Sequence, residues 1–245
     1  MTRGISTFES LARRVYAAPA RLGRVRLVAI DGPSGAGKST FTDRLATACA
    51  TVAARGPNPA MPPAANPAST VAGPAVAVVH TDDLLDGWRD QFTFWPRLST
   101  RVLDPLRTGR PARYRRYDWA AGRFGAGWTV IEPPAVLVIE GVSAARAAVR
   151  PAATLSVYVT APEPVRLARS LTRDGAAIQP TLDRWRRAEE RFFSADGTPG
   201  AVDLLVDGAA ELPSGQLPSG QLAYGWIRDW PDVDAGGAGG APSAG

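Results

Sequence analysis

The 245-residue chain has one lysine, one cysteine and one histidine. A single cysteine cannot form an intrachain disulfide, and Cys49 falls on the apolar side of an expected helix, as a core residue would. No apolar run approaches the roughly 18 residues of a membrane span, and the first ten residues lack the apolar segment of a secretory signal. We therefore expect a cytoplasmic protein that does not enter a membrane.

Long blocks of like charge are also missing, although the chain is basic. The formal net charge is +5, and the basic residues are spread along the sequence. No groove-reading motif accompanies them, which disfavours nucleic-acid binding as a main role. A modest positive surplus suits an anionic small molecule equally well. With 45% apolar residues the chain can bury a substantial core.

Short apolar runs alternate with amphipathic segments along the chain. This alternation predicts an α/β fold in which a five-stranded parallel sheet is covered by helices on both faces. The expected strands are 25–31, 75–80, 135–141, 154–160 and 202–208, and the expected helices are 6–18, 38–52, 98–107, 163–174 and 181–193.

The single lysine lies in GPSGAGKS, which fits the pattern G-x-x-x-x-G-K-[ST]. An expected strand precedes the motif and an expected helix follows it. Glycines let the backbone N–H groups turn inward around phosphate oxygens, and the helix N-terminus adds a positive field. We predict a phosphate-binding loop, the P-loop, that binds ATP through Gly32, Pro33, Ser34, Gly35, Ala36, Gly37, Lys38, Ser39 and Thr40.

This loop explains why one lysine is kept. Arginine supplies 27 of the 28 basic residues, yet its wide planar guanidinium does not fit a cradle that accepts a slim ammonium group. Lys38 is expected to bridge the β- and γ-phosphates and so to take part in catalysis. Ser39 is expected to hold Mg²⁺.

Acidic residues stand at the ends of three expected strands, where ligands of an open parallel sheet bind. They are Asp31, the pair in HTDD, and Glu140. Phosphoryl transfer needs a metal and benefits from a base near the acceptor hydroxyl. Glu140 is placed to orient the metal. Either Asp82 or Asp83 is placed to take the acceptor proton, and the other could cap the following helix. The neighbouring His80 is interpreted as structural.

The segment RYRRYDWAAGRF, residues 113–124, mixes aromatic and arginine side chains. Tyr117 and Trp119 are expected to border a planar acceptor, with Arg123 and Asp83 also on the substrate side. The alternative is an aromatic-anchored surface loop.

Two rows of arginine at helical spacing follow, in 163–174 and 181–193. Such rows can form an arginine-rich helical lid that closes over phosphates and stabilises transition-state charge. We expect Arg169 and Arg173 to act in catalysis and Asp174 to orient one of them. The alternative is a salt-bridged surface.

The order of GPSGAGKS, TDDLLDGW, YRRYDW, VLVIEGV and VYVTAPEPVRLARSLTRD resembles the uridine kinase-like family of P-loop nucleoside kinases. The resemblance covers roughly residues 22–208. It implies that ATP and Mg²⁺ are cofactors, that a small nucleoside is the phosphate acceptor, and that the chain self-associates.

The resemblance also implies roles for particular residues. Asp82 corresponds to the catalytic base, Tyr117 lines the nucleoside pocket, Glu140 belongs to the metal site, and Arg169 and Arg173 lie near the phosphates. The chain departs from the family in the acceptor region, where no histidine follows the Y-D motif and two leucines replace an aromatic residue. The lid also lacks a second R-G-R-D-like run.

Three readings of the function follow. The first is a kinase for a uridine- or cytidine-like nucleoside, and the second is a kinase for another alcohol or for a nucleoside monophosphate. The third is a regulatory ATPase or nucleotide switch with no small acceptor, which the aspartate pair disfavours because a switch needs no acceptor base.

Composition divides the chain into an N-terminal helix packed on the core (1–21), a P-loop kinase domain (22–210) and a low-complexity tail (211–245). A Pro/Ala-rich stretch within the domain, 54–74, is expected to be a disordered insert, and the tail, which repeats LPSGQ, is expected to be disordered. Deleting residues 212–245 is therefore expected to leave nucleotide binding intact.

Overall fold

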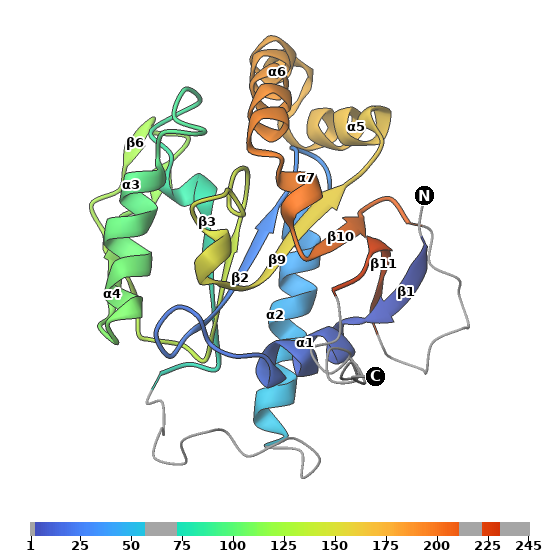
Figure 1. Cartoon of the computed structure of the whole chain (residues 1–245). Coiled ribbons are helices and arrows are strands. Elements are labelled where there is room, and N and C mark those ends of the chain that lie inside the picture. The colour runs from blue at the N-terminus through green and yellow to red at the C-terminus, as the bar shows by residue number, and fades with distance from the viewer. Residues whose placement is uncertain (1–2, 57–72, 211–221, 231–245) are drawn as a thin grey trace, which may run out of the picture.

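The computed structural model describes residues 3–56, 73–210 and 222–230 (Figure 1). Its centre is a seven-stranded sheet with the order β1-β11-β10-β9-β2-β8-β3. Five adjacent strands are parallel, as the sequence predicted: β2 (Arg26–Asp31), β3 (Val76–His80), β8 (Val136–Glu140), β9 (Ala153–Thr160) and β10 (Leu204–Asp207).

The sheet has two strands more than predicted. β1 (Gly4–Thr7) pairs with β11 (Ala223–Arg228), which pairs with β10, and both pairings are antiparallel. The predicted helix 6–18 includes part of β1, because four residues carry too little periodicity to show a strand. The expected disordered tail is wrong over β11, whose strand pattern was hidden behind the LPSGQ repeat. Residues 211–221 and 231–245 of that tail, and 57–72 of the expected insert, lie outside the described residues.

Helices cover both faces of the sheet. Neighbouring residues of β2 show this directly, because Leu27 and Ala29 belong to one buried cluster while Val28 and Ile30 belong to the other. α1 (Phe8–Ala17) and α2 (Lys38–Ala54) pack in the second cluster. Residues of α6 (Gln179–Asp196) pack in the first, and α5 (Glu163–Asp174) lies beside α6 at the top of the molecule (Figure 1).

The expected helix 98–107 is present but irregular. It comprises α3 (Trp95–Leu98), a π-helical turn η2 (Ser99–Leu103) and α4 (Asp104–Arg107). The remaining elements are small: η1 (Thr81–Leu84), β4 (Ala112–Tyr114) paired with β7 (Thr129–Ile131), β5 (Tyr117–Asp118) paired with β6 (Arg123–Phe124), η3 (Arg150–Ala152), η4 (Ala176–Ile178) and α7 (Thr198–Ala201). Within the described ranges, no helix is long and apolar enough to cross a membrane.

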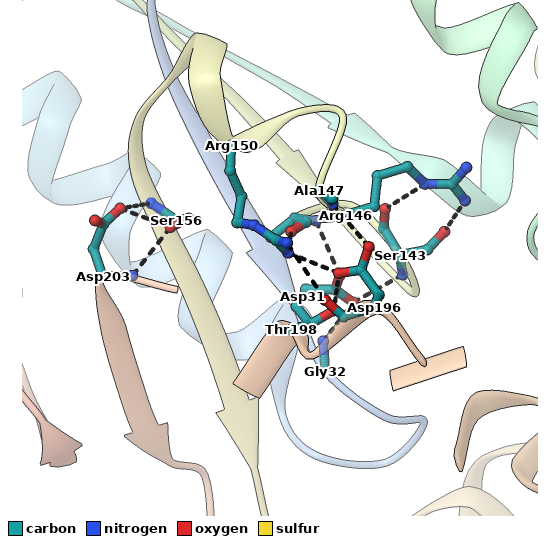
Figure 2. A network of polar contacts seen from close by, with 11 residues as sticks. Asp31, Gly32, Ser143, Arg146, Ala147, Arg150, Ser156, Asp196, Thr198 and Asp203 are labelled. Carbon is teal, nitrogen blue, oxygen red and sulfur yellow. Dashed lines mark hydrogen bonds and ion pairs between the residues drawn. The ribbon is translucent and has the colours of Figure 1, made fainter. Parts of the chain in front are cut away.

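A buried carboxylate joins the loops at the carboxyl edge of the sheet (Figure 2). Asp31 accepts hydrogen bonds from the backbone N–H groups of Gly32 (2.7 Å), Ser143 (2.8 Å) and Ala145 (2.9 Å). Burial raises the pKa of Asp31 to about 7, against the opposing effect of the three donors. Asp31 thus fixes the start of the P-loop to the loop that follows β8.

Candidate active site

The P-loop runs from the end of β2 to the start of α2 at Lys38. Gly35 and Gly37 have φ angles of 77° and 103°, a region that favours glycine. A Cβ atom on Gly35 would also collide with the Arg166 carbonyl oxygen on α5. The Lys38 ammonium donates to the Pro33 carbonyl oxygen at 3.1 Å. The local geometry therefore fits a loop whose backbone and single lysine hold phosphate.

A cavity of about 560 Å³ lies at the carboxyl edge of the sheet, around this loop. It brings together most of the site residues that the sequence predicted. Its walls include Ser34, Gly35, Gly37, Lys38, Ser39, Thr40, Asp82, Glu140, Arg169 and Arg173. Three predicted loop residues, Gly32, Pro33 and Ala36, are buried and are not among the residues that line it.

Ser39 and Glu140 meet in this cavity. The Ser39 hydroxyl donates to Glu140 Oε1 at 3.3 Å, and His80 Nδ1 lies 2.6 Å from the same oxygen. Burial opposes ionisation of Glu140, but the His80 hydrogen bond and the Lys38 charge outweigh it and hold its pKa below the ordinary value. The same hydrogen bond raises the pKa of His80. His80 thus contacts a candidate metal ligand, Glu140. Its position directly before TDD, as the single histidine of the sequence, could have suggested that it contacts the site.

The donor set fits Mg²⁺. A hydroxyl and a carboxylate are hard oxygen ligands, and Mg²⁺ is commonly bound through one or two carboxylates with phosphate oxygens and water. Among the described residues, no group of three or more His, Cys, Asp or Glu side chains could hold a metal by itself. Ser39 and Glu140 therefore provide a partial site that phosphate oxygens would complete.

The two neighbouring aspartates of η1 differ in their surroundings. Asp82 lines the cavity, whereas Asp83 lies outside its walls and forms an ion pair with Arg116 at 2.9 Å. Asp82 is accessible from the cavity, yet surrounding protein atoms desolvate its carboxylate and raise its pKa, with Glu140 adding to the effect and Lys38 opposing it. Of the two aspartates, Asp82 is therefore the one that faces the cavity around the phosphate loop.

The predicted lid arginines also reach the cavity. Arg169 donates to the carbonyl oxygens of Gly35 (3.3 Å) and Gly208 (3.1 Å), which ties α5 to the P-loop. Arg173 forms paired hydrogen bonds with Asp174, at 2.8 and 2.7 Å, so Asp174 orients this arginine as expected.

The predicted acceptor residues are not among the cavity walls. Tyr117 and Trp119 contact one another edge-on at 5.1 Å, and Arg123 is exposed on β6. Trp119 contacts Trp88 at 5.1 Å, and Trp88 contacts Trp185 at 5.4 Å. Because Trp185 lines the cavity, these two tryptophans, which the sequence reasoning missed, connect the acceptor segment to it.

Another wall was missed because it comes from β11 and the start of α1. Phe8, Phe41 and Tyr224 line the cavity, and their ring centroids lie 5.0 to 5.3 Å apart. Since Thr7 pairs with Ala223, both segments reach the carboxyl edge of the sheet next to the P-loop. The cavity therefore has an aromatic wall beside the phosphate loop.

A second cavity, of about 260 Å³, lies beside η1. It is lined by Leu84, Arg97, Arg101, Tyr114, Arg115, Phe124 and Trp128. Arg97 donates to the Leu84 carbonyl oxygen at 2.8 Å, and Arg115 lies over the Trp128 ring at 4.8 Å. This cavity combines positive charge with aromatic surface.

The family model described as Phosphoribulokinase / Uridine kinase family matches residues 95–189. That range begins after the P-loop, so the match is independent of the phosphate-loop motif. A curated relative, Inorganic pyrophosphatase TTM1 of Arabidopsis thaliana, is 28% identical over 157 residues. The match covers 60% of this chain but only 20% of that protein.

Two solved structures share the fold. A possible uridine kinase from Bacillus stearothermophilus gives a TM-score of 0.55 at 18% identity, covering 82% of this chain and 97% of that chain. A candidate fructose transport system kinase from Silicibacter sp. TM1040 gives 0.54 at 21% identity, covering 78% and 95%. The fold and the family model together confirm the resemblance of this chain to the uridine kinase-like family of P-loop kinases.

Proposed function

We propose that the chain is an ATP-dependent phosphotransferase that moves the γ-phosphate to a hydroxyl of a small acceptor, a uridine- or cytidine-like nucleoside. The observation that carries this proposal is the cavity in which Lys38, Asp82 and Glu140 face one another. A lysine on a phosphate loop, a carboxylate for the metal and a second carboxylate for the acceptor are the parts that phosphoryl transfer requires.

The phosphates would lie against the backbone N–H groups of the P-loop, with Lys38 beside the β- and γ-phosphates. Ser39 and Glu140 would hold Mg²⁺, with His80 orienting the Glu140 carboxylate. When bound, the metal would neutralise charge on the phosphate oxygens.

Asp82 would accept the proton of the acceptor hydroxyl as the new O–P bond forms and the bond between the γ-phosphorus and the β–γ bridging oxygen of ATP breaks, with ADP as the leaving group. Its raised pKa makes the carboxylate a stronger base than a solvated aspartate. Arg169 and Arg173 would place positive charge near the transferred group, and Arg173 is held for this by Asp174.

Support for a nucleoside acceptor comes from the aromatic group formed by Tyr117, Trp119 and Trp88, which offers flat surface to a base. A sugar hydroxyl is the alternative acceptor, because one of the structural neighbours is a candidate fructose transport system kinase. We further propose that the protein is cytoplasmic and self-associates.

A phosphorylated acceptor, such as a nucleoside monophosphate, is the second candidate. The second cavity supports it, because Arg101 and Arg115 supply cationic groups beside the turn that carries Asp82, whereas Arg97 is paired with Asp90.

ADP release from MgATP tests these readings. The purified chain would be given nucleosides, sugars, nucleoside monophosphates or no acceptor, and the phosphorylated product would be identified by mass spectrometry. We expect release to depend on a nucleoside and to yield its monophosphate. Release of inorganic phosphate at the same rate without any acceptor would overturn the kinase proposal in favour of an ATPase.

A further inference from the structure

A buried carboxylate of α6 contacts the P-loop directly. Glu189 is only 1% exposed, and its Oε1 atom accepts from the Ser34 backbone N–H at 3.0 Å and the Ser34 hydroxyl at 2.6 Å. Ser34 is the third residue of the phosphate loop, and it lines the cavity. The contact therefore joins the helix that follows the lid arginines to the loop predicted to hold phosphate.

The same oxygen takes a third hydrogen bond from Trp185, one turn earlier on α6. Its Nε1 atom donates to Glu189 Oε1 at 2.7 Å. The segment that follows Asp82 and Asp83 holds Trp185 in turn: Trp88 packs on its ring at 5.4 Å, and the Gln91 amide donates to its carbonyl oxygen at 3.2 Å. Glu189 is thus the point at which α6 and the P-loop are connected to the segment that follows Asp82 and Asp83.

Energetics distinguish this contact from ordinary helix packing. Removing the acceptor of a buried N–H group costs more than the net value of one hydrogen bond, because the donor loses water without gaining a partner. Here three donors depend on one carboxylate oxygen, while the second oxygen, Oε2, is buried and has no hydrogen-bond partner within the described part of the chain. If the only role of Glu189 were to pack α6, its carboxylate would not need a position in which one of the two oxygens lacks a hydrogen-bond partner.

We propose that Glu189 is a positioning residue that holds Ser34, and with it the phosphate loop, in register with the segment that follows Asp82 and Asp83. Trp185 fixes the Glu189 carboxylate from the acceptor side. This inference rests on the proposed function for its consequence in catalysis, but the contact itself is testable through nucleotide binding alone.

Four single variants test it. Glu189→Ala removes the acceptor, and Glu189→Gln retains a carbonyl oxygen that can accept the same bonds. Trp185→Phe keeps ring packing on Trp88 but loses the N–H donor. Glu190→Ala, on an exposed neighbour in the same helix, is the matched control. Binding of a non-hydrolysable MgATP analogue is measured by calorimetry, and turnover is measured with the acceptor found for the wild type.

We expect Glu189→Ala to weaken analogue binding by about tenfold or more, the loss of one hydrogen bond to a charged group, and Glu189→Gln to stay within about threefold of wild type. Trp185→Phe should raise the acceptor KM by more than it raises the analogue Kd. Glu190→Ala should change neither. If Glu189→Ala does not fold, Trp185→Phe still decides the matter through the acceptor KM.

A folded Glu189→Ala that binds the analogue like wild type would overturn the proposal. The proposal would also be overturned if Glu189→Gln bound the analogue as weakly as Glu189→Ala, because a carbonyl acceptor would then not suffice. An unchanged acceptor KM in Trp185→Phe would overturn it as well. Failure of the wild type itself to bind the MgATP analogue would instead refute the proposed function.

Discussion

The Asp83 carboxylate lies 2.9 Å from the guanidinium Nε of Arg116 and outside the cavity that its neighbour Asp82 lines. Two adjacent acids on one turn therefore have different environments. The sequence left open which of them acts as base. The ion pair favours Asp82 as the base, because it holds the Asp83 carboxylate against Arg116 and outside the cavity.

We predict that Asp82→Asn lowers kcat by about 10² to 10⁴-fold, the usual contribution of a general base, with little change in MgATP affinity. Asparagine retains the shape of the side chain but cannot accept the proton. Steady-state ADP release with the identified acceptor measures the effect.

Asp83→Asn is the matched control on the same turn. It should lower kcat by less than about tenfold, since it weakens only the pairing with a largely exposed Arg116. If the two variants lose activity equally, or if Asp83→Asn loses more, the assignment of the base is wrong.

The pH dependence of the reaction should report the Asp82 environment. Desolvation raises its pKa above that of a solvated aspartate, and only the ionised form accepts a proton. Activity should therefore fall as pH decreases through this raised pKa. The profile of kcat/KM against pH should show an acidic limb above 3.8, the ordinary value for aspartate. Asp82→Asn should remove that limb, and a limb that persists unchanged would assign it to another group.

Replacing the single lysine with arginine tests whether the P-loop requires the shape of the side chain as well as its charge. Lys38→Arg keeps the positive charge, but its planar fork does not fit a loop where the ammonium lies 3.1 Å from the Pro33 carbonyl oxygen. We expect MgATP binding to weaken by at least about tenfold. Arg169→Lys, on exposed α5, should bind MgATP much better than Lys38→Arg in the same calorimetric assay. Wild-type affinity in Lys38→Arg would show that shape does not select lysine.

Local motifs were predictable and distant contacts were not. The P-loop, Asp82 and Glu140 follow apolar strands, so their place at the carboxyl edge of a parallel sheet could be inferred from chain order. Glu189 reaches Ser34 across 155 residues, and nothing in the spacing of α6 separates it from other helical acids. β11 was missed because it follows the LPSGQ repeat and because β1, one of its two partners, lies at the opposite end of the chain.

Aromatic residues near the Y-D motif were also only partly predicted. Tyr117 and Trp119 do form an aromatic group, but its connection to the cavity runs through Trp88 and Trp185, on other elements. Side-chain packing between segments of different secondary structure has no period in the sequence, so it could not be inferred from pattern.

The buried Asp31 should make stability depend on pH. Its pKa is raised to about 7 in the folded state from 3.8, so the folded state keeps a proton that the unfolded chain loses. The free energy of unfolding is therefore expected to fall as pH rises from about 4 to about 7, and to level off above it.

Asp31→Asn removes this titration and leaves the Ala145 N–H without its carboxylate acceptor. The variant should be less stable than wild type, and the difference should shrink between pH 4 and pH 7. Urea unfolding at several pH values measures both curves. A difference that is constant with pH would show that Asp31 is ionised throughout this range.

The C-terminal strand reverses an expectation drawn from composition. β11 pairs with β1 and β10, and Tyr224 forms part of the cavity wall with Phe8 and Phe41. Deleting residues 212–245 would leave the edge of β10 unpaired and remove Tyr224 from that wall. We therefore expect this truncation to lower the Tm and to weaken MgATP binding by at least about tenfold.

A shorter truncation is the control. Deleting residues 231–245 keeps β11 and the contacts of Arg14 with Asp229 and with the Trp230 carbonyl oxygen. It should leave Tm and nucleotide affinity near those of the full chain. Calorimetric titration and thermal unfolding of both proteins measure the two effects. Equal affinity in the two truncated proteins would mean that β11 does not contribute to the nucleotide site, whatever its place in the sheet.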